Sequence, residues 1–152
     1  MRVLTLQQPW ASLVVMGAKK WETRSWKPSN AMRHLIQMHD LLIHSSAKFD
    51  WQHRNLLTFP PFKKYLPNAD ALPLGAILGY VSVGRIITTE HWLKENPGYP
   101  EEQAMGNYSS GRWAWEFTKA VQWEFPIQAK GSLSLWEYDG PFFMKNAKSE
   151  VL

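Results

Sequence analysis

The chain has 152 residues, a length that fits one domain able to bury about 70% of its unfolded surface. It contains no cysteine, which excludes disulfides, thiolate metal sites and a cysteine nucleophile. Lys and Arg number 17 against 13 Asp and Glu, and this net charge of +4 mildly favours anionic partners such as RNA. Residues 1–20 lack the apolar run of a signal peptide and no segment approaches a membrane span, so we expect a soluble cytoplasmic protein.

Aromatic residues are the most informative part of the composition. Nine Trp, five Tyr and seven Phe make up 14% of the chain. Some of these rings must build the core, because large aromatic side chains dominate the energy of burial. The surplus also suits a pocket in which a nucleobase stacks on a ring, an interaction worth roughly 1–3 kcal/mol per base.

The first 26 residues predict a strand, a short helix and a second strand. Residues 2–6 alternate between apolar and polar side chains and predict a strand. Residues 7–20 predict a helix with Pro9 in its first turn and Gly17 at its end. Residues 20–26 alternate again. A strict period of two places four side chains on one face of this second strand: Lys20, Glu22, Arg24 and Trp26.

The middle of the chain predicts a mixture of helix and strand. Residues 34–46 suit one or two strands with a break at His39–Asp40, and a helix is the alternative for their first half. Residues 49–59 predict a helix that stops before a pair of prolines. Residues 62–74 predict a loop with a helical turn, and residues 75–89 predict a long, bent strand rich in Val, Ile and Gly.

The last third predicts one more helix and further strands. Residues 89–96 predict a short helix capped by Thr88 or Thr89. Residues 97–111 predict a polar loop, and loops of this length in compact domains are often functional. Residues 112–138 predict two or three strands, and residues 143–152 predict a loose tail after a single domain at 1–142. Strands joined mainly by loops favour an α+β, mainly β fold: a small barrel of five to six strands flanked by short helices.

One short motif has a recognisable context. Residues 17–24, GAKKWETR, fit the pattern G-x-K-x-x-E-x-R, follow the predicted first helix and open the second strand. Four further segments accompany the motif along the chain: LTLQQPWASLVV, LLIHSSAK, GAILGYVSV, and GRWAWEF with PIQAKGSLSLW. In this order they resemble the ASCH domain family, a branch of the PUA-like superfamily. The resemblance covers most of the chain.

The resemblance implies a PUA-like barrel with a cleft beside the motif strand and an association with RNA or modified nucleosides. Some small family members are amidohydrolases that remove acyl groups from N4-acylated cytosine nucleosides such as N4-acetylcytidine. Our leading hypothesis is therefore an amidohydrolase of this type. The alternatives are a module that binds RNA or a modified base without catalysis, and a ribonuclease in which Lys19 and Arg24 stabilise the transition state.

Lys19 and Glu22 are the predicted catalytic pair. Amide hydrolysis needs a base for the attacking group and positive charge where the oxyanion forms. Alternation pairs Glu22 with Lys20, so the motif requires Lys19 to lie in the turn before the strand. The amidohydrolase members carry threonine where Glu22 stands, so here either the pair activates water or a hydroxyl from elsewhere attacks. The alternative for the pair itself is an exposed ion pair worth about 0–1 kcal/mol.

Other side chains are candidates for binding the substrate. Arg24 suits a carbonyl oxygen or a phosphate, or an ion pair with Glu22. The remaining candidates are stacking rings, a base-reading amide, a polar cluster at a strand end and lid residues of the polar loop: Trp10 and Trp26; Gln8; His44, Ser45, Ser46 and Lys48; Tyr108 and Arg112. Ser45, Ser46 and Tyr108 are also the candidate hydroxyl nucleophiles.

The expected partners follow from these sites. The five histidines show no metal-binding spacing, so we expect no metal and no cofactor. The expected partner is a small-molecule nucleoside or RNA, with no membrane, and the chain is expected to be a monomer. An RNA binder needs a basic stripe. The barrel would have to assemble one from residues distant in the sequence: Lys63, Lys64, Arg85 and Lys94.

Overall fold

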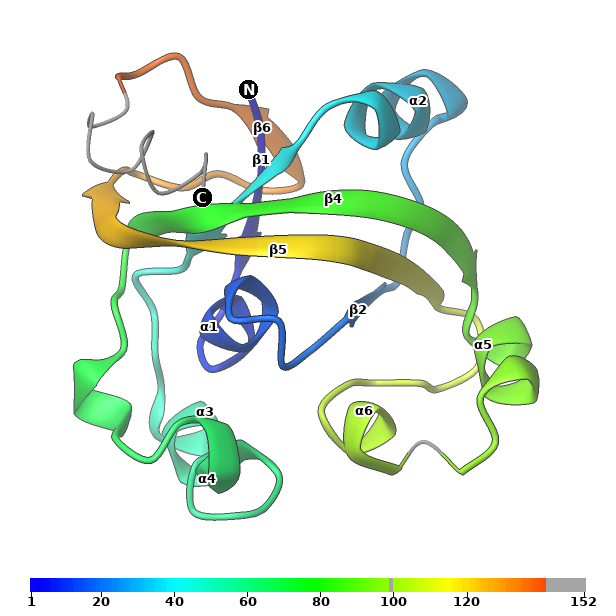
Figure 1. Ribbon diagram of the computed structural model, residues 1–152, viewed down its shortest axis with the longest axis horizontal. Coiled ribbons are helices and arrows are strands. Elements are labelled where there is room, and N and C mark those ends of the chain that lie inside the picture. Colours follow the sequence, from blue (N-terminus) through cyan, green and yellow to red (C-terminus); the bar gives the residue numbers. More distant parts are fainter. Residues whose placement is uncertain (99, 142–152) are drawn as a thin grey trace.

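A computed structural model describes residues 1–98 and 100–141 of the chain. Within these ranges the strands form one sheet, and short helices lie around it (Figure 1). The strands are β1 Arg2–Leu6, β2 Trp21–Arg24, β3 Leu41–Ser45, β4 Ala76–Thr88, β5 Trp113–Gln128 and β6 Leu135–Glu137. The helices are α1 Trp10–Val15, α2 Asn30–Met38, α3 Trp51–Leu56, α4 Phe62–Tyr65, the 3₁₀ helix Ala69–Ala71, α5 Thr89–Glu95 and α6 Pro100–Ala104. The predicted tail at 143–152 lies outside the described residues.

The sheet has the order β2-β5-β4-β3-β1-β6. Strands β1 and β3 run parallel, and the other neighbouring pairs are antiparallel. The long strands β4 and β5 pair along most of their length, with register shifts beside Gly79 and Val83. Such bulges bend a strand and increase its twist, so the sheet curls into a six-stranded half-barrel. The α+β, mainly β fold predicted from the sequence is confirmed.

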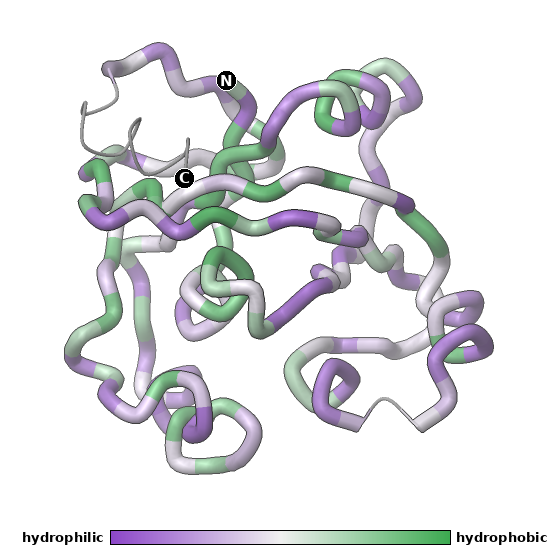
Figure 2. Tube along the Cα trace, in the orientation of Figure 1, coloured by the Kyte–Doolittle hydropathy of each residue, from purple (hydrophilic) through white to green (hydrophobic). Residues whose placement is uncertain are grey.

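Helix α1 fills the hollow of this curled sheet. All its residues after Trp10 are buried, and Val14 and Val15 pack with apolar residues of β1, β3, β4 and β5. Figure 2 shows hydrophobic residues along the central strands and α1, whereas the outer helices are more hydrophilic. Two further groups of helices, α3 with α4 and α5 with α6, flank α1 on opposite sides (Figure 1). Helix α1 is therefore packed against the sheet and lies between these two groups of helices.

The segment 30–45 resolves the choice that the sequence left open. Residues 30–38 form α2, and the side chain of Ser29 caps its first turn by accepting a hydrogen bond from the Met32 backbone N–H at 3.2 Å. His39 and Asp40 form the break, and β3 follows. The helical alternative for the first half is confirmed.

Two predictions about local structure are wrong. The loop predicted at 97–111 contains α6, which begins at Pro100 and carries acidic side chains in its first turn, where they favour a helix N-terminus. Strand β2 ends at Arg24 rather than continuing to residue 26, because Ser25 and Trp26 lie in a bend. The period of two therefore does not extend to Trp26, and its ring does not follow the face of Glu22 and Arg24.

No helix among residues 1–98 and 100–141 is long and apolar enough to cross a membrane.

Candidate functional site

The turn between α1 and β2 places Lys19 inside the molecule. Gly17 adopts a φ of 80°, a left-handed conformation that glycine tolerates well, and the chain reverses there. The backbone N–H groups of Ala18 and Lys19 then both donate to the Leu13 carbonyl, each at 3.0 Å. Lys19 thus lies before the regular strand begins, and its side chain is fully buried. Lys20, one residue later, is exposed.

The Lys19 ammonium lies between two carboxylates. Its Nζ is 4.0 Å from Glu22 Oε1 and 3.9 Å from Glu102 Oε2, and it donates a hydrogen bond to the Trp21 carbonyl. We call Lys19, Glu22 and Glu102 the buried charge cluster. Taking charges out of water is costly unless they are paired. One ammonium facing two carboxylates meets that requirement and concentrates reactive groups at one place.

Glu102 was missed by the sequence analysis. Its Oε1 accepts hydrogen bonds from the backbone N–H groups of Lys20 at 2.5 Å and Trp21 at 2.9 Å, which ties α6 to the start of β2. Within the described parts of the chain its Oε2 has no hydrogen-bond partner. Burial raises the pKa of the Glu102 carboxyl despite the opposing effect of Lys19, so this side chain holds a proton more readily than an exposed glutamate.

Tyr108 lies close to the same cluster. Its ring packs on Trp92 with centroids 4.1 Å apart, and 7% of the residue is exposed. Its hydroxyl has no hydrogen-bond partner among the residues that the structure describes. Burial, followed by the charges of Glu102 and Glu22, raises the pKa of the Tyr108 phenol well above its usual range. The phenol is therefore a poor candidate for a nucleophile that must lose its proton.

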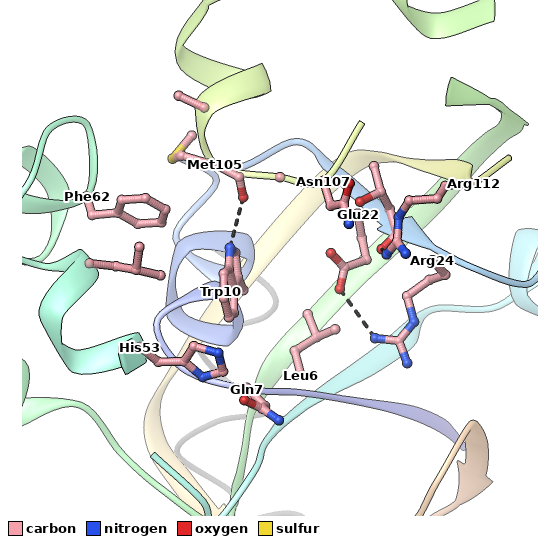
Figure 3. A pocket seen from close by; sticks show the side chains of 14 residues that line it. Leu6, Gln7, Trp10, Glu22, Arg24, His53, Phe62, Met105, Asn107 and Arg112 are labelled. Carbon is pink, nitrogen blue, oxygen red and sulfur yellow. Dashed lines mark hydrogen bonds and ion pairs between the residues drawn. The ribbon is translucent and has the colours of Figure 1, made fainter. Parts of the chain in front are cut away.

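A cavity of about 460 Å³ opens beside the buried charge cluster. One wall is largely aromatic and includes Trp10, His53 and Phe62, from α1, α3 and α4. The opposite wall is polar and consists mainly of four side chains: Glu22, Arg24, Asn107 and Arg112. Figure 3 shows the Glu22 carboxylate between Trp10 and Arg24, with Asn107 and Arg112 next to it. The cavity thus combines a stacking surface with charged and amide groups.

The aromatic wall is held in place by contacts of its own. The Trp10 indole N–H donates to the Met105 carbonyl at 2.9 Å, which joins α1 to the segment that follows α6. The His53 ring packs edge-on against Trp10 with centroids 4.9 Å apart. Because the indole N–H is engaged, the Trp10 ring has a fixed orientation at the cavity. The contributions of His53 and Phe62 were not expected from the sequence.

The two arginines of the polar wall differ in their contacts. Arg24 Nη1 is 3.6 Å from Glu22 Oε2, and its guanidinium also lies over the Trp26 ring, 5.7 Å from the centroid. Arg112 Nη2 donates to the Thr23 carbonyl at 3.0 Å, which attaches the end of the loop to β2. Both guanidinium groups therefore reach the cavity from anchored positions.

Of the predicted binding residues, Trp10, Arg24 and Arg112 line this cavity together with Glu22. Trp26 instead packs edge-on against Trp115 in the core, with centroids 5.1 Å apart. Gln8 is fully buried and uses its amide within the fold, donating to the Pro73 carbonyl and the Ser12 hydroxyl and accepting from the Ser12 N–H.

The polar residues at the end of β3 and just after it lie elsewhere. His44 is buried, with Nδ1 3.1 Å from the Thr5 hydroxyl and Nε2 2.7 Å from the Ala129 carbonyl. Burial lowers the pKa of the His44 imidazole. Ser45 is buried and bonds the Ala76 backbone. Ser46 lines a second cavity together with His44, and Lys48 is exposed and lines neither cavity.

Within residues 1–98 and 100–141, no three His, Asp or Glu side chains are arranged as metal ligands. What the buried charge cluster offers chemically is a carboxylate, an ammonium and a carboxyl group with a raised pKa, next to two guanidinium groups. These are the components of acid–base catalysis with electrostatic stabilisation of an oxyanion.

Comparisons with known proteins agree with this fold. No curated protein matches the sequence. Similar solved structures include one mutant ASCH protein from Zymomonas mobilis, the ASCH protein itself and a second mutant, with TM-scores of 0.54, 0.53 and 0.52. Each is 13% identical and covers 99% of this chain, and the match covers 93%, 92% and 95% of those chains, a likeness that shows the fold. The family model for the ASCH domain matches residues 4–127, so the chain belongs to the ASCH domain family.

Proposed function

We propose that the protein is an amidohydrolase that removes the acyl group from N4-acylated cytosine nucleosides, with Glu22 as the general base and Lys19 as the cation that positions it. One observation carries this proposal. A buried ammonium, its two carboxylates and two guanidinium groups meet beside a cavity with an aromatic wall. ASCH membership is compatible with a hydrolase or an RNA-binding protein, and the geometry of this cavity favours the hydrolase.

The size and shape of the cavity suit one nucleoside. A volume of about 460 Å³ falls within the roughly 300–1,000 Å³ of typical small-molecule sites. The Trp10 ring offers a surface on which a pyrimidine can stack. A base held there has its exocyclic amide directed to the polar wall, where the Glu22 carboxylate lies. A long groove for a polymer is not needed for this arrangement.

The proposed reaction uses groups on the polar wall. The Glu22 carboxylate takes a proton from water while the water oxygen attacks the acyl carbon. The resulting oxyanion is stabilised by the Arg24 and Arg112 guanidinium groups. The carbon–nitrogen bond then breaks, and the proton held by Glu22 passes to the departing N4 nitrogen. The products are a carboxylic acid and the free cytosine nucleoside, and the water supplies all the atoms gained.

Lys19 acts in this scheme through Glu22. Its ammonium is fully buried, and one of its contacts is to the Trp21 carbonyl, so it is a positioning residue rather than a group that touches the substrate. Glu102 is the second carboxylate facing the ammonium, and its hydrogen bonds with the Lys20 and Trp21 N–H groups fix the start of β2. The pair of carboxylates holds Lys19 in a fixed place, and Lys19 in turn holds Glu22 at the cavity.

The competing hypothesis is RNA recognition without catalysis, and the surface gives it less support. The four basic residues from which a stripe would be assembled lie on α4, β4 and α5. Two of them are engaged with carboxylates: Lys64 with Glu101 at 3.4 Å, and Arg85 with Glu95 at 2.9 Å. Paired cations have less positive charge to offer a phosphate chain. These contacts therefore favour a small substrate in the cavity over an RNA chain bound along the surface.

The proposal is tested by mixing the purified protein with N4-acetylcytidine and following the ultraviolet change as cytidine forms. We expect turnover by the unsubstituted protein and a loss of about 10²–10⁴-fold in Glu22→Gln, which keeps the size of the side chain but removes the base. Glu124→Gln is the matched control, because Glu124 is exposed on β5 and does not line the cavity. Equal rates in Glu22→Gln and the control would refute the assigned base. No turnover of several acylated cytidines, together with salt-sensitive RNA binding, would favour the competing hypothesis.

A further inference from the structure

Asn107 lines the cavity, and hydrogen bonds fix the orientation of its side-chain amide. Its Oδ1 accepts a hydrogen bond from the Ser109 backbone N–H at 3.0 Å and another from the Ser109 hydroxyl. A backbone N–H can only donate, so this atom must be the amide oxygen, and the other must be the NH₂ group. Within the described residues the NH₂ group has no partner. Because Asn107 lines the cavity, it offers the ligand hydrogen-bond donors.

The position of Asn107 relative to the buried charge cluster is fixed by its neighbour. A Cβ placed on Gly106 would lie 3.5 Å from Lys19 Nζ, so the chain before Asn107 runs against the Lys19 ammonium. That ammonium is 4.0 Å from Glu22 Oε1. Figure 3 shows Asn107 next to Glu22 on the polar wall. An amide donor and a carboxylate acceptor therefore line the same cavity.

This pair matches one edge of a pyrimidine ring. N4-acylated cytosine carries an N–H at its N4 position and an unprotonated N3 next to it, which is a donor followed by an acceptor. Uracil carries a carbonyl oxygen and an N3–H in the same places, which is the reverse order. In the orientation that directs the N4 amide to Glu22, cytosine N3 faces the Asn107 donor. Uracil in the same orientation would place its carbonyl oxygen opposite the Glu22 carboxylate and its N3–H opposite the Asn107 donor.

We propose that Asn107 is the residue that distinguishes cytosine-type from uracil-type rings in this cavity, by donating a hydrogen bond to N3. The inference rests on the proposed function for the orientation of the ring. A site built to hydrogen-bond a ligand rejects an analogue that leaves its polar groups unpaired more strongly than an apolar site can. Selectivity therefore arises at the loop after α6, separately from the general base on β2.

Asn107→Asp isolates this donor. The substitution keeps Oδ1 for both bonds from Ser109 and replaces only the NH₂ group with an acceptor. Asn30→Asp is the matched control, because Asn30 is exposed at the start of α2 and lies outside the cavity lining. Both nucleosides to be compared, cytidine and uridine, are neutral at pH 7.5. The added charge therefore affects the two affinities in a similar way, and their ratio reports on recognition.

The test is a calorimetric titration of the three proteins with cytidine and with uridine. We expect the unsubstituted protein and Asn30→Asp to bind cytidine about tenfold more tightly than uridine, and Asn107→Asp to bind both with similar affinity. A ratio near one in the unsubstituted protein, an unchanged ratio in Asn107→Asp, or no binding of either nucleoside would each overturn the inference. Selective binding that Asn107→Asp removes, without any hydrolysis of N4-acetylcytidine, would support Asn107 as the reading residue and refute the amidohydrolase.

Discussion

Two buried polar clusters of this protein differ in how completely their atoms are bonded. Around His44, the Trp136 indole N–H donates to the Thr5 hydroxyl at 2.9 Å, the Thr5 hydroxyl contacts His44 Nδ1, and Nε2 bonds the Ala129 carbonyl. In the buried charge cluster, Glu102 Oε2 has no hydrogen-bond partner within the described residues, and Lys19 faces its carboxylates at 3.9 and 4.0 Å.

This difference supports a structural role for the cluster around His44 and the proposed functional role for the buried charge cluster. A fully bonded polar network stabilises and fixes a fold, whereas partly satisfied buried groups cost stability and are retained where they do chemistry. Only the buried charge cluster borders the cavity with the aromatic wall. Both clusters include residues that the sequence singled out, and hydrogen bonding rather than residue type distinguishes them.

The largest effect is expected from removing the cation of the buried charge cluster. Lys19→Met leaves the Glu22 and Glu102 carboxylates without the ammonium that both of them face, and breaking a buried ion pair in this way typically costs about 3–5 kcal/mol of unfolding free energy. Burial already raises the pKa of Glu102, and losing Lys19 raises it further. A carboxyl with a raised pKa stabilises the folded state when protonated, so the loss should shrink between pH 7.5 and pH 5.

Denaturant unfolding at the two pH values measures this effect. Lys20→Met is the matched control, because Lys20 is the exposed neighbour. If Lys19→Met and Lys20→Met lose the same small amount of unfolding free energy at pH 7.5, then Lys19 does not pair with Glu22 and Glu102 as described.

A smaller effect on stability, and none on turnover, is expected at His44. His44→Leu removes the contacts to Thr5 and Ala129 and leaves the part-buried Ala129 carbonyl without its donor, at a cost of about 2–4 kcal/mol. The turnover of N4-acetylcytidine should stay unchanged below the unfolding transition. His34→Leu, on the exposed face of α2, is the control for surface histidines. A stable but inactive His44→Leu would move His44 into the functional site.

The smallest effect is a pH dependence that His44 adds to stability. Burial lowers the pKa of His44 below its ordinary value of 6.5, so below pH 6.5 the unfolded chain takes up a proton that the folded protein binds less readily. The contribution of His44 is therefore fully present above pH 6.5 and is lost as the pH falls towards the folded pKa. Unfolding free energies of the unsubstituted protein and His44→Leu should converge as the pH is lowered. A constant difference between them would contradict this assignment.

Local alternation predicted the motif strand, and the resemblance of the motif to the ASCH family implied the place of Lys19. The G-x-K-x-x-E-x-R pattern required Lys19 to lie in a turn, and the structure places it there with a buried side chain, while Lys20 is exposed. Period two also placed Glu22 and Arg24 on one face, where their charged groups lie 3.6 Å apart. These features depend on neighbouring residues, and sequence spacing describes such neighbours well.

Contacts between distant segments were not predictable in the same way. Glu102 lies 80 residues beyond Glu22, and the acidic first turn of α6 indicates a helix start but not the strand that Glu102 contacts. Asn107 faces the cavity because Glu102 ties α6 to β2 and Gly106 lies against Lys19. A single sequence contains no signal for such long-range contacts, since they depend on how the loops pack on the finished sheet.

The most direct test of the contrast between the clusters is to measure turnover and unfolding free energy together in Glu22→Gln and His44→Leu. We predict that Glu22→Gln loses turnover but keeps most of its stability, because Lys19 retains Glu102 and the Trp21 carbonyl as partners. His44→Leu should show the opposite result. If instead turnover falls in both variants only in proportion to stability, the buried charge cluster is part of the scaffold and the account is wrong.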